Sequence, residues 1–449
     1  MKLAEALRLD SPTPSHFVLS LAGAGGKTTA LFKLARELIS ARNPRILVAA
    51  TSHLGIWQIP QADHHQIAAD RSDLRTLPAA GIVLVTGEIE GERTKPVSAQ
   101  VLNRLHQYSK EFFTPLLIEA DGSRQKPLKA PAEHEPPIPA FTDIAVHVAG
   151  LSALHQPLDE SVVHRAGIFS ELTGLSMGKT LTTETLAKYL THPSGALKNI
   201  PQNAKRVALL NQADTPELLS ACGRIAREIQ PAFDAVIAGS LKSGSLYRFE
   251  RRAGIILAAG TSSRFGQPKQ LLDWDGKPFI RHVTETALRS GLEPVVVVTG
   301  FRHADVESHL HELPVSVVYN TDYATGQSSS IRAGINALPA GVGAAVFLLA
   351  DQPQIPVEVI RALTETHASG GQPILAPLVL EERRANPVLF DRKTFPDLLQ
   401  LQGDVGGRGI FDKHRVEYLP WHDDILIFDV DTIEDYERLK RMREVESRK

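Results

Sequence analysis

The chain has 449 residues, 43% hydrophobic and 22% charged, proportions typical of a soluble globular protein. This length exceeds one ordinary hydrophobic core and predicts two or three domains. A net charge of -2, without a run of Lys and Arg, argues against a nucleic-acid partner, which normally requires clustered positive charge. The single cysteine, Cys222, excludes an internal disulfide framework and fits a reducing compartment.

The first ten residues carry charges throughout and lack the apolar core of a signal peptide. Apolar runs such as 294–298 and 344–350 have the length of strands and are too short to cross a bilayer. We therefore expect a cytoplasmic protein without a membrane partner.

The first motif is an apolar stretch that runs into a glycine loop, with Gly25 and Gly26 directly followed by Lys27 and Thr28. Leucines at helical spacing follow, so a helix is predicted to begin at Lys27. Backbone amides, an ammonium group and a hydroxyl would then surround one point, as a β-phosphate and its magnesium ion require. Leu21 stands where the standard pattern has glycine, which makes the loop a variant. We expect ATP or GTP here, the alternative being a tight turn capped by Thr28.

A strand predicted at residues 116–122 carries Glu119 and Asp121 on one side, because alternate residues of a strand share a face. Both carboxylates could therefore face a magnesium ion held by Thr28, and we expect Asp121 to be a metal ligand. The alternative is that one of them caps the following glycine turn.

Several motifs of the first half occur in the order found in a known family. Residues 211–214 resemble the Asn-Lys-x-Asp base-reading motif of GTPases, with Asp214 at the base-binding position and Gln212 in place of the lysine. With the glycine loop and the segment 121–136, they resemble the YqeC-like selenium-dependent hydroxylase accessory proteins over residues 15–240. The resemblance implies a P-loop NTPase-like domain and a molybdenum hydroxylase as client.

The histidines of the first half are too irregularly spaced to define a zinc site, and the cysteines that usually help to bind zinc are missing. For each of them, a hydrogen-bonded or exposed side chain is the simpler interpretation. His134 and His164 have polar or charged neighbours and are the two worth testing.

The chain becomes polar and loses its pattern over residues 240–252, where we place a domain boundary. The predicted domains are 1–248 and 249–449, both doubly wound α/β folds. After the boundary, strands and helices alternate: strands at 294–299, 315–319 and 344–350, and helices at 279–289 and 329–338.

A second glycine motif begins with the apolar strand 254–259 and turns at Gly260. Successive amides beyond Gly260 can surround an anion, and Arg264 and Lys269 add the two cations that a triphosphate needs. The alternative is an ordinary turn between strand and helix with two solvated cations.

Carboxylates end two further segments of the second half. Asp351 follows the apolar strand 344–350, where it can bind a magnesium ion that bridges the α-phosphate and the leaving pyrophosphate. Asp429 and Asp431 are expected to share one face of another strand. Asp351 alternatively caps the turn that follows it.

The string Leu257-Ala-Ala-Gly260-x-Ser262-x-Arg264-x-Gly266-x-x-Lys269 resembles the signature of molybdenum cofactor nucleotidyltransferases, most closely the cytidylyltransferases. Ala259 favours CTP, because the guanylyl relatives usually have a further glycine there. The resemblance covers residues 254 to about 440 and implies a Rossmann-like domain in which Asp429 is the second metal ligand. It implies that the following residues bind the nucleotide or the acceptor: Leu257, Ala258, Ala259, Gly260, Ser262, Gly266, Ser329, Asn386 and Arg408.

The implied reaction is Mg²⁺-dependent transfer of CMP from CTP to the molybdopterin cofactor, with release of pyrophosphate. Arg264, Lys269 and Asp351 would be the catalytic residues. Alternatives are guanylyl transfer, or another acceptor such as a sugar phosphate, because fold and glycine loop are shared across many substrates. The first domain is expected either to hydrolyse its nucleotide or to act as a sensing scaffold without turnover.

Overall fold

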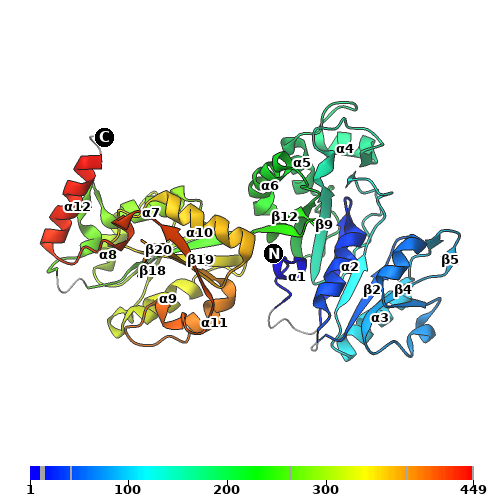
Figure 1. Cartoon of the computed structure of the whole chain (residues 1–449), viewed down its shortest axis with the longest axis horizontal. Helices are drawn as coiled ribbons and strands as arrows, with labels where there is room; N and C mark the ends of the chain where they lie inside the picture. Colours follow the sequence, from blue (N-terminus) through cyan, green and yellow to red (C-terminus); the bar gives the residue numbers. More distant parts are fainter. Residues whose placement is uncertain (11–15, 41–42, 262–264, 381, 447–449) are drawn as a thin grey trace. The chain divides into compact units, whose positions relative to one another are not determined.

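The computed structural model describes residues 1–10, 16–40, 43–261, 265–380 and 382–446. The chain forms two compact units, Met1–Phe249 and Glu250–Lys449, each with its own sheet (Figure 1). No helix within the described ranges has both the length and the apolar composition needed to cross a membrane. Parallel pairings dominate both sheets, which confirms the predicted α/β class.

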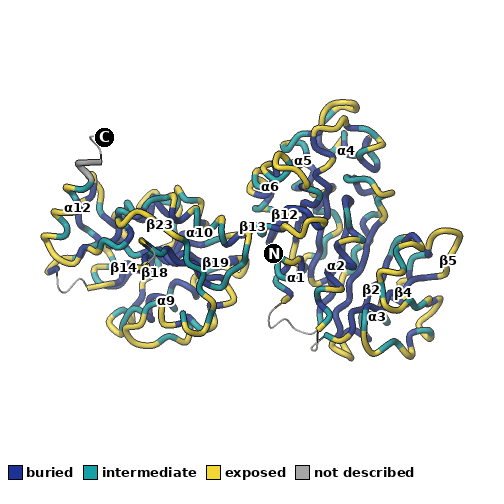
Figure 2. The backbone as a smooth tube through the Cα atoms, in the orientation of Figure 1, coloured by how far each residue is buried: buried dark blue, intermediate teal, exposed yellow. Residues whose placement is uncertain are grey.

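In the part of the chain that the structure describes, the sheet of the first unit has nine strands, in the order β13 (Ser245–Phe249), β12 (Ala235–Ser240), β11 (Lys205–Asn211), β9 (Ile144–Gly150), β1 (Val18–Gly23), β7 (Leu116–Glu119), β2 (Arg45–Ala50), β4 (Gly81–Thr86) and β3 (His64–Ile67). Neighbouring strands run parallel except at the edge, where β13 pairs antiparallel with β12. The central strands are buried along their whole length (Figure 2), as expected for parallel strands covered on both faces.

Alternate residues of a strand point to opposite faces of the sheet. Because both sets are apolar here, helices cover both faces. Leu19 of β1 packs in one cluster with Leu31 of α2, whereas Val18 packs in another with Leu105 of α3. The helices of the unit are α1 (Leu3–Ala6), α2 (Lys27–Leu38), α3 (Ala99–Glu111), α4 (Ala166–Thr173), α5 (Thr183–Thr191) and α6 (Pro216–Ile229). Two short ribbons lie outside the main sheet: β5 (Ile89–Glu90) with β6 (Arg93–Thr94), and β8 (Leu128–Lys129) with β10 (Val163–His164).

The segment 240–252 is not the patternless linker that its polar sequence indicates. β13 lies in the middle of it, and only Glu250 separates β13 from β14 (Arg251–Ala258), the first strand of the second unit. β13 is an edge strand in which Leu246 is buried and the other residues are partly or fully exposed, which explains why it carries so little hydrophobic signal.

Within the described ranges, the sheet of the second unit runs in the order β18 (Ser316–Tyr319), β17 (Val295–Thr299), β14, β19 (Val342–Leu349), β22 (Val388–Asp391), β20 (Ile374–Val379) and β21 (Arg383–Arg384), and β23 (Val416–Trp421) also pairs with β20. The strands from β18 to β19 are parallel, whereas β22 runs antiparallel to both β19 and β20. The sheet is therefore mixed. A hairpin, β15 (Asp273–Trp274) and β16 (Lys277–Pro278), lies outside it.

The helices of the second unit are α7 (Phe279–Arg289), α8 (His303–Ser308), α9 (Gln327–Asn336), α10 (Val357–Gly370), α11 (Phe395–Leu398) and α12 (Ile433–Glu446). α7 has the predicted bounds, and the predicted strands differ from β17, β18 and β19 by one or two residues at their ends. Ile256 of β14 packs in a cluster with Ile280 of α7, and its neighbour Ile255 packs with Ile331 of α9.

The prediction of a strand around Asp429 and Asp431 is wrong. A short 3₁₀ helix, η9 (Asp424–Ile427), and a loop lead into α12, so these two carboxylates do not share a strand face. Two polar residues just after them, Thr432 and Asp435, cap the start of α12. The Asp435 carboxylate accepts from the Thr432 backbone N–H at 2.9 Å and the Thr432 hydroxyl accepts from the Asp435 N–H at 3.2 Å, a reciprocal cap.

Gly334 allows α9 to lie close to β14. A Cβ at this position would be 2.6 Å from Cγ2 of Ile255 and 3.2 Å from Cγ2 of Val298, both buried and branched. We expect Gly334→Ala to lower the free energy of unfolding of the second unit by about 1–3 kcal/mol, the usual cost of overpacking. Urea unfolding measures it, with Gly341→Ala as the control because a Cβ there meets nothing within 4 Å. Equal stability of the two variants would contradict this account of the packing.

Candidate functional site

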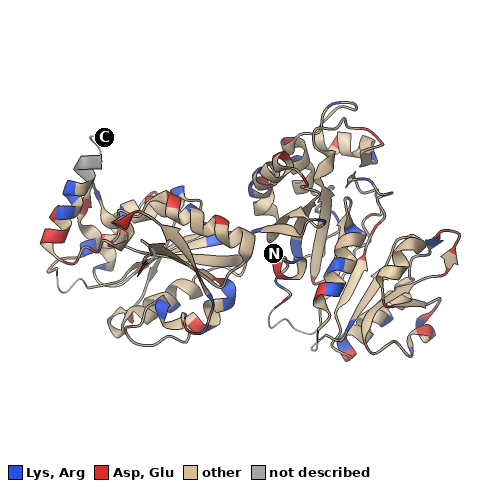
Figure 3. Cartoon of the chain, in the orientation of Figure 1, with Lys and Arg blue, Asp and Glu red and all other residues tan. Residues whose placement is uncertain are grey.

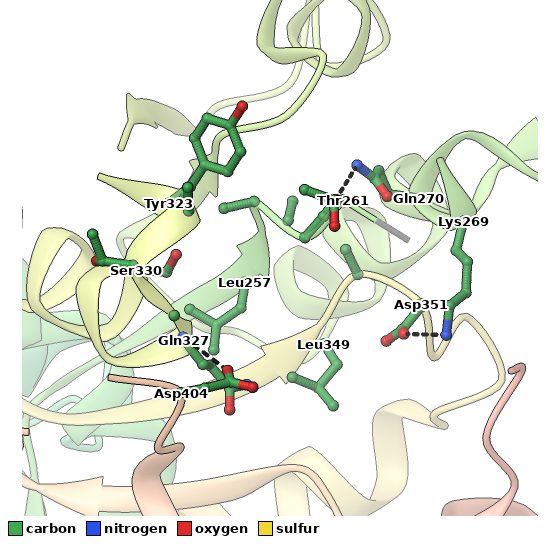
Figure 4. A pocket seen from close by; sticks show the side chains of 17 residues that line it. Leu257, Thr261, Lys269, Gln270, Tyr323, Gln327, Ser330, Leu349, Asp351 and Asp404 are labelled. Atoms are coloured by element: carbon green, nitrogen blue, oxygen red, sulfur yellow. Dashed lines mark hydrogen bonds and ion pairs between the residues drawn. The ribbon is translucent and has the colours of Figure 1, made fainter. Parts of the chain in front are cut away.

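The second unit has a cavity of about 510 Å³ at the carboxyl ends of β14 and β19 (Figure 4). β14 ends at Ala258, and Ala259 and Gly260 follow it along the cavity. Six of the residues predicted from sequence line this cavity: Leu257, Ala258, Ala259, Gly260, Lys269 and Asp351. Ser262 and Arg264 lie outside the described residues.

Lys269 lies between two carboxylates. Its Nζ is 2.9 Å from Oδ1 of Asp431 and 3.4 Å from Oδ2 of Asp351. Burial alone would lower the pKa of Lys269, but Asp431 and Asp351 together raise it, so the side chain remains a cation. Burial raises the pKa of Asp351 above its ordinary value, although Lys269 opposes this. This ion pair can open toward an anionic ligand.

Asp429 lies near Asp351, whose pKa its charge helps to raise. The buried Gln352 holds Asp429 in place, because its Nε2 donates to Oδ1 of Asp429 at 2.8 Å. Oδ of the two aspartates and the buried, unpaired Oε1 of Gln352 are the oxygen donors that a magnesium ion prefers. Two neighbouring carboxylates repel each other unless a cation lies between them. Asp351 lines the cavity, whereas Asp429 does not. The two carboxylates are candidate ligands of the predicted metal ion.

Four other residues that were predicted to bind the nucleotide or the acceptor do not line this cavity. Ser329 is buried, and its hydroxyl donates to the Gly326 carbonyl at 2.8 Å and accepts from Asn320, so it holds the turn before α9. Gly266, Asn386 and Arg408 do not line the cavity either, and an Arg408 guanidinium N–H donates to the Arg384 carbonyl.

Neighbours of these residues line the cavity instead: Ser330, Gln327, Tyr323 and Asp404. In Figure 4 the Gln327–Asp404 pair and the Lys269–Asp351 pair lie apart from each other, with Leu349 between them. The glycine motif that begins at Gly403 indicated a binding role for this region. It did not indicate that Asp404, and not Arg408, would line the cavity. Which of Ser329 and Ser330 faces the cavity depends on the rotational phase of α9. That phase could not be predicted without knowing the residue at which α9 begins.

The first unit has a second cavity, of about 670 Å³, at the loop between β1 and α2. Gly23, Gly25 and Gly26 have φ of 95°, 80° and 121°, the left-handed region that favours glycine. A Cβ at Gly23 would lie 2.2 Å from the Val148 carbonyl oxygen, and one at Gly25 would lie 2.3 Å from a backbone nitrogen, so the loop tolerates no side chain at either position. α2 begins at Lys27, as predicted.

The two carboxylates expected beside Thr28 have different partners. The Thr28 hydroxyl donates to Oε2 of Glu119 at 2.8 Å, and burial raises the pKa of Glu119. Asp121 instead accepts from the Gly23 N–H at 3.1 Å and pairs with two buried lysines. The geometry therefore favours Glu119 rather than Asp121 as the carboxylate that would hold a magnesium ion with Thr28.

A chain of alternating charges starts at the glycine loop. Nζ of Lys27 lies 3.4 Å from Asp121, Asp121 lies 2.7 Å from Nζ of Lys129, and Lys129 lies 2.8 Å from Glu135, which binds Arg165 at 2.7 Å. Lys27 also donates to the Gly23 carbonyl at 2.6 Å. Burial alone would raise the pKa of Glu135, but Lys129 and Arg165 lower it to about 2.

The predicted base-reading segment is only partly at this cavity. Gln212 lines it, whereas Asp214 does not and accepts a hydrogen bond from the Ser240 hydroxyl. Asn211 braces the loop by donating from Nδ2 to the Gly25 carbonyl at 2.8 Å. His134 and His164 both line the cavity.

Among the described residues, one group of three buried side chains has the composition of a metal site: Glu250, His367 and Asp391. His367 already binds Asp391 at 2.9 Å through Nε2 and accepts from Arg252 at Nδ1, at 3.3 Å. None of the three lines either cavity, so we treat them as a hydrogen-bonded network of the core.

Comparison with known proteins divides the chain at the same place. Residues 19–167 match the family model of the YqeC protein, and residues 254–418 match that of the MobA-like NTP transferase domain. The uncharacterized protein YqeC of Escherichia coli is 36% identical over 210 residues, which cover 43% of this chain and 75% of that protein. Nicotine blue oxidoreductase of Paenarthrobacter nicotinovorans is 31% identical over 197 residues, covering 41% of this chain and 95% of that protein. The molybdenum cofactor cytidylyltransferase of Escherichia coli is 26% identical over 190 residues, covering 40% of this chain and 92% of that protein.

The pairing of Glu135 predicts a pH-dependent contribution to stability. Because its folded-state pKa is lowered to about 2, this contribution is complete above the ordinary pKa of the carboxyl and is lost as the pH falls through the folded value. We expect Glu135→Gln to lower the free energy of unfolding by about 3 kcal/mol at pH 7, as removal of one partner of a buried pair does. The difference from the wild-type chain should shrink steadily toward pH 3.

Urea unfolding of the full chain across this pH range measures the effect. Glu133→Gln is the matched control, because Glu133 is exposed and is two residues away. A Glu135→Gln penalty that does not depend on pH would mean that packing, and not charge, is what the side chain contributes.

Proposed function

This chain belongs to the YqeC family through its first half and carries a MobA-like NTP transferase domain in its second, and on that basis we propose that it is a molybdenum cofactor cytidylyltransferase fused to a nucleotide-binding maturation domain. In the proposed reaction, an oxygen of the terminal phosphate of molybdopterin attacks the α-phosphorus of CTP. The bond to the β-phosphate breaks, and pyrophosphate leaves. The observation that carries the proposal is that Lys269 and Asp351 form an ion pair in the cavity that Gly260 also lines, at the end of β14.

The protein's main task in this reaction is to place and neutralise charge. A phosphomonoester is largely ionised near neutral pH, with a second pKa of about 6, so its attack needs no general base. The amides beyond Gly260 would bind the triphosphate, and Lys269, which pairs with Asp431 and Asp351, would turn from Asp431 to the phosphates.

Asp351 and Asp429 would hold a magnesium ion, which supplies charge neutralisation between the α-phosphate and the leaving pyrophosphate. Nε2 of Gln352 donates to Oδ1 of Asp429 at 2.8 Å, so a hydrogen bond within the protein positions the second carboxylate. Alignment of the attacking and leaving oxygens then supplies most of what phosphoryl chemistry requires of a protein.

The preference for CTP over GTP rests on Ala259 and on the relative that is named as a cytidylyltransferase. Ala259 is buried at the cavity, and a Cβ added at Gly300 would be 2.8 Å from its methyl group, so this part of the wall is closely packed. A glycine at position 259 would leave more room. Guanylyl transfer is the second candidate, since molybdenum cofactor guanylyltransferases match 61 or 62 residues of the chain at 44% identity.

The test is pyrophosphate release by the full chain with magnesium, molybdopterin and one nucleotide at a time. We expect release with CTP and little with GTP, ATP or UTP. Lys269→Ala should lower the turnover number by a factor of about 100, the usual effect of losing a preorganised electrostatic contact. Lys277→Ala is the matched control, since Lys277 is an exposed lysine that pairs with Glu285. Full activity of Lys269→Ala would refute the site, and release with GTP alone would identify the second candidate.

For the first unit we propose a nucleotide hydrolase that controls delivery of the finished cofactor to a molybdenum hydroxylase. Glycine-loop amides, Lys27 and the Thr28–Glu119 pair are the groups that would bind ATP or GTP with its magnesium ion. Fusion keeps synthesis and delivery on one chain at high effective concentration. A scaffold that binds nucleotide without turnover is the alternative.

Phosphate release from ATP and GTP by the full chain distinguishes the hydrolase from the scaffold. We expect slow release that Lys27→Ala abolishes, because the variant loses the cation at the β-phosphate. Asp121 keeps Lys129 as a partner in this variant, and thermal unfolding checks that the unit stays folded. Lys110→Ala, an exposed lysine on α3, is the control. Nucleotide binding without any phosphate release by the wild-type chain would favour the scaffold.

A further inference from the structure

The cavity of the first unit carries more positive charge than one nucleotide requires. Three carboxylates and five cationic side chains line it. The cationic side chains are Lys27, Arg93, Arg124, Lys126 and Arg165. Lys27 and a magnesium ion between Thr28 and Glu119 would already offset much of a triphosphate's charge. Of the other four, Arg165 pairs with Glu135 at 2.7 Å and Lys126 with Glu160 at 3.4 Å. Arg93 and Arg124 form no ion pair with the described residues, and both signs are otherwise interspersed over the unit (Figure 3).

Arg124 is the most available of these cations. It is exposed, it lines the cavity, and it forms no ion pair within the described ranges. Its segment packs directly on the glycine loop, since the Gly25 N–H donates to the Lys126 carbonyl at 3.1 Å. An anion at Arg124 would therefore lie beside the nucleotide's phosphates.

The backbone around this part of the cavity is strained. Arg124, Gln125, Arg165 and Gln212 are not glycines, yet their φ values are 51°, 61°, 66° and 66°, and all four line the cavity. A left-handed conformation costs a residue with a side chain about 1 kcal/mol. Such residues gather at ligand-binding sites, where the surrounding structure holds them.

His164 is a buried polar side chain that lacks a protein partner. It is 9% exposed, it lines the cavity, and its ring forms no hydrogen bond to the described part of the chain. Burial, together with the charges of Arg165, Lys129, Arg124 and Lys126, lowers the pKa of His164 to about 4, so the ring is neutral at pH 7. A neutral imidazole has one donor and one acceptor. Neither ring nitrogen of His164 is a fully enclosed atom among the described residues, so both are accessible to a ligand in the cavity.

We propose that this cavity binds a second ligand beside the nucleotide, a phosphomonoester whose phosphate is held by Arg124, Lys126, Arg165 and His164. The excess of cations matches the double negative charge of a phosphomonoester better than the single charge of a carboxylate. Arginine guanidinium groups form paired hydrogen bonds with phosphate oxygens. His164 can donate one further bond from its protonated nitrogen. The inference rests on the proposed nucleotide site only for the position of the neighbouring ligand.

The experiment is isothermal titration of the full chain with inorganic phosphate as the probe, first alone and then after saturation with ADP and magnesium. We expect phosphate to bind in both cases. Arg124→Ala should weaken it about tenfold or more, the effect of losing one charge-assisted hydrogen bond. Because Arg124 is exposed, this variant should fold, and Arg71→Ala, another exposed arginine of the same unit, is the matched control. His164→Gln, checked by thermal unfolding, tests the buried donor.

Three outcomes would overturn the inference: no heat of phosphate binding, equal binding by wild type and Arg124→Ala, or loss of phosphate binding once ADP is present. The last would mean that these cations serve the nucleotide's own phosphates. Failure of ADP to bind would count against the proposed nucleotide site alone, because phosphate binding that depends on Arg124 is measured without ADP as well.

Discussion

Two lysines that are almost completely removed from water determine how the cavity of the first unit, the proposed nucleotide site, is built. Lys27 and Lys129 are 3% and 2% exposed, and an unpaired charge in such a position costs several kcal/mol. Asp121 lies between them, and Glu135 continues the pairing to Arg165. These residues come from α2, the segment after β7, β8, a loop and the start of α4. One chain of ion pairs therefore fixes the glycine loop against the segments that close the cavity around it.

The second unit has the opposite ratio of charges. One lysine, Lys269, faces Asp351 and Asp431, and Gln352 holds Asp429 close by. These groups are less buried than those of the first unit, so their pairing costs less to break. An excess of carboxylate suits a site that takes up a metal ion together with a triphosphate. The charges of the first site thus pair with one another, whereas the second site has carboxylates in excess, which the proposed metal ion would neutralise.

Patterns that depend on neighbouring residues could be predicted from sequence. α7, the start of α2 at Lys27 and the apolar strands follow from hydrophobic periodicity and glycine placement, which are local. The roles of Glu119 and Asp121 could not be assigned from sequence. Asp121 forms an ion pair with Lys129, which lies eight residues further along the chain, and no local pattern predicts that contact. The prediction of a strand at Asp429 was wrong because the same polar residues can occur at a capped helix start and at the end of a strand. Ser330 was missed by one position, since a helix turns 100° per residue and its phase depends on its first residue.

The direct passage from β13 to β14 has a consequence for how the two halves can be taken apart. Proteases cut chain that is exposed and can be drawn out of the fold. Between Phe249 and Arg251 there is only Glu250, which is 3% exposed, and both neighbours belong to strands. Limited digestion would therefore nick loops inside each half before it separated them. A gene fragment that ends at residue 249 or begins at 251 places a charged chain terminus at the end of a paired strand, so each half is better expressed with residues of the other left attached.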